Sequence, residues 1–99
     1  MAYFAQNVTL ADATNGEFVG TVIVAPATPT TIVSTDESGG AGGAIVDVEI
    51  AGASQAKWQK AGTINGTGTG ALMVQTGTPI RVRIRNITSS TNMSVETGA

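Results

Sequence analysis

The stretch that decides the fold is Ile80-Arg-Val-Arg-Ile-Arg85, in which apolar and charged residues alternate without a break. Successive side chains of a β-strand point to opposite faces of a sheet. The pattern therefore predicts a strand with Ile80, Val82 and Ile84 facing a core and the arginines facing outward. Residues 45–51, Ile-Val-Asp-Val-Glu-Ile-Ala, alternate in the same way, with two carboxylates in place of guanidinium groups. Both stretches are typical of half-buried strands.

Similar segments recur along the chain, separated by clusters of Gly, Pro, Asn and Asp. The Asn15-Gly16 pair favours a turn with positive φ, and residues 18–25 are apolar enough to suggest a central strand. The sequence predicts an all-β fold, an antiparallel β-sandwich or jelly roll of about seven to eight short strands. The predicted strands are Tyr3–Leu10, Phe18–Ala25, Thr30–Thr35, Ile45–Ala51, Lys57–Lys60, Ala71–Gln75, Ile80–Ile87 and Asn92–Thr97.

The length of the chain, 99 residues, suits a single β domain over residues 1–99. Two segments stand apart in this prediction. Residues 1–8 are a candidate N-terminal arm, and residues 36–43, Asp-Glu-Ser-Gly-Gly-Ala-Gly-Gly, predict a flexible Gly-rich loop.

Histidine and cysteine are both absent from the chain. This removes the commonest general base, the thiol nucleophile and most zinc ligands. Asp47 and Glu49 are the one carboxylate pair worth considering, and a solvated or salt-bridged strand face explains them better than glycosidase chemistry. The sequence therefore predicts a protein that is not an enzyme, with no catalytic residue, metal site or cofactor.

Charged residues make up only 12% of the chain, and the net charge is −2. Soluble domains usually carry about 25%, so the low charge favours a surface partly covered by other subunits. A nucleic-acid partner is not expected without a basic excess. No segment reaches the ~20 apolar residues of a membrane helix, and no signal peptide is recognisable. We therefore expect synthesis and folding in a cytoplasm, without a membrane partner.

The stripe formed by Arg81, Arg83 and Arg85 is the strongest electrostatic feature of the sequence. Alternation places the three guanidinium groups on one face of a strand. They can pair with Asp47 and Glu49 if the two strands are neighbours, or they can serve contacts between subunits. The sequence leaves both interpretations open.

Three aromatic residues are further interface candidates. Tyr3 and Phe4 lie in the candidate arm. Trp58, the only tryptophan, lies between Lys57 and Lys60. A core or interface position is favoured for Trp58 over an exposed stacking platform.

Four segments carry a resemblance to a known group of proteins: Val46-Asp-Val-Glu-Ile50, Lys57-Trp-Gln-Lys60, Thr78–Asn86 and Asn92–Thr97. In strand spacing, in Thr, Gly and Ala content and in the absence of Cys and His, the chain resembles the small β-rich head decoration, cement and fibre proteins of tailed bacteriophages. The similarity covers about half of the chain and includes no diagnostic motif.

The resemblance implies a structural virion protein that folds in the host cytoplasm and binds the capsid exterior in many copies. Its partners would be the major capsid protein and copies of itself, as a homo-oligomer that is often a trimer. The alternative is a carbohydrate-binding or adhesive β-sandwich module that uses Trp58 as its stacking platform.

Overall fold

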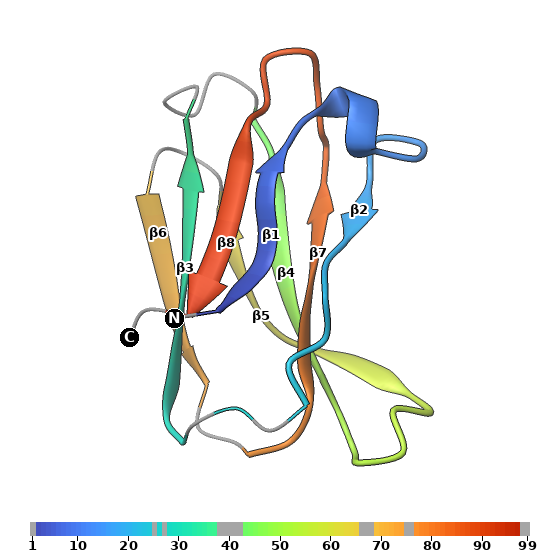
Figure 1. Ribbon diagram of the computed structural model, residues 1–99, viewed down its shortest axis with the longest axis vertical. Helices are drawn as coiled ribbons and strands as arrows, with labels where there is room; N and C mark the ends of the chain where they lie inside the picture. The colour runs from blue at the N-terminus through green and yellow to red at the C-terminus, as the bar shows by residue number, and fades with distance from the viewer. Residues whose placement is uncertain are drawn as a thin grey trace.

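Two four-stranded antiparallel sheets pack face to face in the computed structural model (Figure 1). The structure describes residues 2–24, 26, 28–37, 43–65, 69–74 and 77–97. We call the sheet of order β1-β8-β3-β6 the front sheet and the sheet of order β2-β7-β4-β5 the back sheet. The strands are β1 (Tyr3–Val8), β2 (Phe18–Val19), β3 (Thr30–Asp36), β4 (Ile45–Ala51), β5 (Trp58–Asn65), β6 (Thr69–Val74), β7 (Ile80–Arg85) and β8 (Met93–Thr97).

The strand order is that of a jelly roll. Strand β1 pairs with β8, β2 with β7, β3 with β6 and β4 with β5, so the chain is one long nested hairpin. Pairing of β8 with β3 and of β7 with β4 then wraps this hairpin into two sheets. The predicted sandwich or jelly-roll fold is confirmed. The turn between β4 and β5 is the closed end of the nested hairpin.

The core consists of the inward side chains of both sheets. Ile80, Val82 and Ile84 are fully buried, as their alternation with arginine predicts. Val46 and Val48 from β4 are equally buried. The front sheet closes the core with aliphatic side chains and one aromatic ring: Phe4, Val8, Ile32, Met93 and Val95.

The predicted turn at Asn15-Gly16 is confirmed. Both residues have positive φ, 54° for Asn15 and 76° for Gly16. Thr14 and Glu17 on either side form an isolated antiparallel bridge. The tight turn is possible because Asn and Gly tolerate the left-handed region.

Residues 18–25 were predicted as a central strand, and this prediction is wrong. Its described residues, 18–24, lie at the edge of the back sheet, and only Phe18–Val19 form a regular strand there. Beyond it, Gly20 crosses close to β1, where a Cβ atom would come within 2.3 Å of the Phe4 carbonyl oxygen. An apolar composition indicates burial, but it does not distinguish a central strand from an edge covered by a neighbouring sheet.

Residues 1–8 were predicted as an arm, and the structure corrects this interpretation. Tyr3–Val8 form strand β1, which pairs with β8. Phe4 is 1% exposed and belongs to the core. Deleting residues 3–8 would remove a strand and three core side chains, Phe4, Ala5 and Val8, so this strand is part of the sandwich.

The predicted Gly-rich loop at residues 36–43 falls mostly on residues 38–42, which lie outside the described residues. Asp36 still belongs to β3 and is buried. Strand β5 is longer than predicted and continues to Asn65 beyond its predicted end at Lys60. Over the residues that the structure describes, no helix is long and apolar enough to cross a membrane.

Candidate protein-binding surfaces

The outer face of the back sheet brings the arginine stripe next to the carboxylates of β4. Strands β7 and β4 are antiparallel neighbours, with Arg81 opposite Glu49 and Arg83 opposite Asp47. The alternation of each strand turns these charged residues to the same outer face. The condition for pairing within one subunit is therefore met.

Each arginine of the stripe has a carboxylate partner. Arg81 Nε lies 2.7 Å from Glu49 Oε1, and Arg85 Nε lies 2.8 Å from Asp47 Oδ2. Arg83 bridges two acids, with Nη1 3.1 Å from Glu17 Oε1 and Nε 3.5 Å from Glu49 Oε2. Of the two open interpretations, pairing within the subunit is the one that the structure supports.

The environment of Arg83 also favours its charged form. The hydrogen bond that it donates to Glu17 raises the pKa of the Arg83 guanidinium above its ordinary value. Partial burial acts in the opposite direction, and the negative charge of Glu49 adds to the increase. Arginine is protonated at all physiological pH values, so Arg83 keeps its positive charge in these ion pairs throughout that range.

Trp58 lies on the same outer face and outside the core cluster. It is opposite Ala51 in the β4–β5 ladder and half-buried. The guanidinium carbon of Arg81 stands 4.4 Å from the centroid of the ring. This is a cation–π contact, and it covers one face of the indole. A core position for Trp58 is excluded, and Lys57 and Lys60 beside it are exposed.

The remaining two interface candidates, Tyr3 and Phe4, lie on opposite sides of strand β1. Tyr3 is 42% exposed and is opposite Glu96 on the outer side of the front sheet. Phe4 points into the core, so its assignment as an interface residue is wrong. The register of β1 against β8 shifts twice between Tyr3 and Val8, which places both Phe4 and Ala5 among the buried residues.

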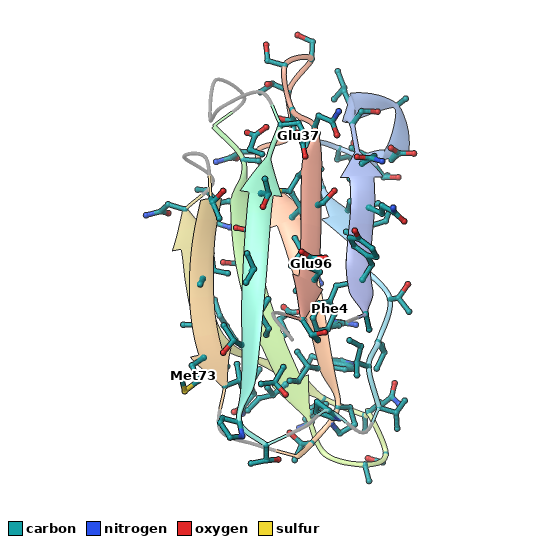
Figure 2. All side chains as sticks on the ribbon, turned by 60° about the vertical axis from the view of Figure 1, so that its left-hand side comes forward. Phe4, Glu37, Met73 and Glu96 are labelled. Atoms are coloured by element: carbon teal, nitrogen blue, oxygen red, sulfur yellow. The ribbon has the colours of Figure 1, made fainter. Side chains whose placement is uncertain are left out.

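The outer face of the front sheet, which we call the front face, was missed by the sequence-based search. One row crosses all four strands, with Tyr3 opposite Glu96, Glu96 opposite Val33, and Val33 opposite Ala71. Figure 2 looks onto this face, with Glu96 on β8 and Met73 on β6. The other side chains of the face are uncharged: Thr31, Thr35, Thr69, Met73 and Ser94.

Glu96 is the one charged residue of the front face. Its Oε2 atom is buried without a hydrogen-bond partner. Its neighbours across the two ladders, Tyr3 and Val33, offer an aromatic ring and an aliphatic side chain. No basic side chain of the described residues forms an ion pair with it, unlike the carboxylates of the back sheet.

A shallow hollow of about 390 Å³ lies beside β2. Its charged lining residues are Asp12, Glu17 and Arg83. Glu17 and Arg83 are paired with each other, and Asp12 Oδ2 accepts a 2.9 Å hydrogen bond from the backbone N–H of Thr9. All three charged side chains of the hollow therefore already have a partner within the chain. Within the described part of the chain, no cluster of three or more acidic side chains is suited to a metal ion.

No protein-family model matches this chain, and neither the curated proteins nor the solved structures contain a match. The geometry of the two outer faces is therefore the basis for a functional argument.

Proposed function

We propose that this protein is a structural, non-enzymatic binding protein that attaches to a larger protein shell through its front face. The observation that carries the proposal is the composition of that face, where Glu96 is the one charged residue across four strands. Protein interfaces are depleted in charge and enriched in Tyr and Met. Tyr3 and Met73 on this face are 42% and 57% exposed.

The back sheet is a poorer candidate for such an interface. Its arginines and carboxylates are already paired, as in the 2.7 Å contact of Arg81 with Glu49. A partner that covered this face would have to desolvate these ion pairs and would offer no new opposite charge in return. On the front face, a partner would have to desolvate the charge of one described side chain, Glu96.

Glu96 indicates the chemistry of the partner. A carboxylate with a buried oxygen that lacks a hydrogen bond is costly in an otherwise uncharged surface. A lysine or arginine of the partner opposite Glu96 would neutralise it. We therefore expect a partner surface that is mostly uncharged and carries one basic group.

The shell that we propose is the capsid of a tailed bacteriophage, with the major capsid protein as partner. Two features support this choice: the resemblance of the chain to head decoration proteins, and the jelly-roll topology, which occurs in viral capsid proteins. A fold alone does not assign a function, so the proposal depends on a direct binding experiment.

The experiment is co-sedimentation with capsids assembled from the major capsid protein encoded beside this chain's gene. The purified wild-type protein should pellet with the capsids. Thr31→Glu, which adds a negative charge to the front face beside Met73, should reduce the bound fraction at least tenfold. Thr21→Glu is the matched control, because Thr21 is an exposed threonine outside the front face and should bind like the wild type.

Two results would overturn the proposal. One is a gene neighbourhood without a capsid gene, or capsids that leave the wild-type protein in solution. The other is equal loss of binding in the two threonine variants, which would show that the front face has no special role.

The surface position of Trp58 supports a second candidate function, a carbohydrate-binding or adhesive module. Because Arg81 covers one face of the indole, the opposite face would have to serve as the platform. Binding to a glycan array that disappears in Trp58→Ala, with the fold retained, would favour this function. Binding to no glycan would reject it.

A further inference from the structure

Strand β6 forms an edge of the front sheet, and this edge differs from the other three. Strand edges expose main-chain N–H and C=O groups that can pair with another chain. Natural proteins protect them with short strands, charged side chains, proline, bulges or a covering segment. The two sheets have four edge strands: β1 and β6 in front, β2 and β5 behind.

The edges formed by β1 and β2 are closed against each other. The backbone N–H of Thr21, just after β2, donates a 2.8 Å hydrogen bond to the carbonyl oxygen of Phe4 in β1. Gly20 packs against the same carbonyl group. Strand β2 itself has only two residues. This side of the sandwich presents no long open edge.

The edge of β5 carries two of the usual protections. Lys60 lies in the strand and Lys57 directly precedes it, and both are exposed. The ladder with β4 is also irregular, with a register shift between Val48 and Glu49. A second strand would meet two positive charges and an interrupted register there.

Within the part of the chain that the structure describes, strand β6 carries none of these protections along its edge, and it contacts β5 through Gly70 and Leu72. It pairs with β3 through six consecutive residue pairs without a register shift. It contains neither charge nor proline, and residues 61–80 form an uninterrupted stretch of the sequence without a charged side chain. Within the described ranges, β3 is the only strand hydrogen-bonded to β6. In Figure 1, β6 forms the left margin of the front sheet.

We propose that β6 pairs with β6 of a second copy of this chain about a two-fold axis, which joins two front sheets into one continuous sheet. Such an interface places the strand against itself, so any charge on it would meet its own copy. Like charges opposite each other destabilise a ladder. An uncharged strand satisfies this condition, whereas two β5 strands would bring lysines together.

The geometry of antiparallel pairing limits the possible registers. A two-fold axis perpendicular to the sheet keeps both front faces on the same side, so residues of equal parity must face each other. With the axis near the middle of the strand, Ala71 lies opposite Ala71 or Met73 of the second copy. In either register, the two Ala71 side chains are direct or diagonal neighbours, within about 8 Å.

The contact is small. One pair of short strands buries less than the ~800 Å² per partner of a standard interface. We therefore expect a dimer that dissociates on dilution, and not the trimer that the resemblance to decoration proteins implies. The pairing does not depend on binding to a shell, because it uses the strand edge and the proposed function uses the face.

The test is sedimentation equilibrium of the isolated full chain over a hundredfold range of concentration. The wild type should pass from monomer to twice the monomer mass. Ala71→Lys, a change at an exposed position of β6, should remain monomeric throughout. Ala53→Lys is the matched control, because this exposed alanine lies in the turn between β4 and β5 and its variant should dimerise like the wild type.

A mixing experiment makes the test specific for self-pairing. Ala71→Lys and Ala71→Glu should each be monomeric alone and should form a dimer when mixed, because opposite charges then face each other. Circular dichroism should show an unchanged fold in all variants. A wild type that stays monomeric at all concentrations, a trimer, or an Ala71→Lys variant that associates like the wild type would overturn the proposal.

Discussion

The two outer faces of this sandwich are built by the same alternation and yet differ in charge. On the back sheet, every arginine of β7 contacts a carboxylate, and Glu49 serves two of them. On the front sheet, a single carboxylate, Glu96, stands between Tyr3 and Val33. The comparison teaches that low overall charge is not spread evenly. The ion pairs lie on the outer face of the back sheet, whereas Glu96 is the one charged side chain on the described front face.

The largest effect is expected from removing the shared carboxylate of the back sheet. Glu49→Gln leaves Arg81 and Arg83 without one of their negative partners at a site where Glu49 is only 14% exposed. The free energy of unfolding should fall by about 1–3 kcal/mol. Urea denaturation followed by circular dichroism measures it.

Glu96→Gln is the matched control on the front face. It removes the same charge, but the carboxylate has no ion pair to lose among the described residues. Because it also removes the charge of a carboxylate whose Oε2 is buried without a hydrogen bond, we expect the free energy of unfolding to stay the same or to rise by up to about 1 kcal/mol, together with weaker binding to capsids. Equal destabilisation by the two substitutions would remove the difference between the faces.

An intermediate effect is expected at the aromatic end of the back face. Trp58→Ala removes the cation–π contact with Arg81, worth about 1 kcal/mol, besides the apolar surface that the ring covers. Met73→Ala on the front face shortens a side chain that is 57% exposed and should change stability by less than about 0.5 kcal/mol. Thermal unfolding of both variants checks the order, and a larger loss for Met73→Ala would contradict it.

Among the substitutions on the back face, the smallest effect is expected at its rim. Glu17 and Arg83 form an ion pair of 3.1 Å, and their side chains are 47% and 33% exposed. Because solvent screens such pairs, Glu17→Gln should cost less than about 1 kcal/mol. The loss should vanish in 1 M salt, where the Debye length is about 3 Å. A loss that persists in salt would indicate a role for Glu17 beyond the ion pair.

Local pattern was enough to predict the type of fold and the orientation of its clearest strands. The burial of Ile80, Val82 and Ile84 follows from alternation with arginine, since the period of a strand is two residues. The Asn15-Gly16 turn follows from the backbone freedom of these two residues. The absence of His and Cys is equally a property of the sequence.

The neighbours of each strand were decided by the tertiary structure. Nested pairing placed Glu49 beside Arg81 and put Trp58 above that arginine. The same pairing assembled the row of the front face from four strands that lie far apart in the sequence. A two-residue period tells which side of a strand faces the core, but it carries no information about which strand lies alongside. Hence the absence of His and Cys could be read from the sequence alone, whereas only the folded chain showed that the charged pairs gather on the back sheet and that Glu96 is the one charged side chain on the described front face.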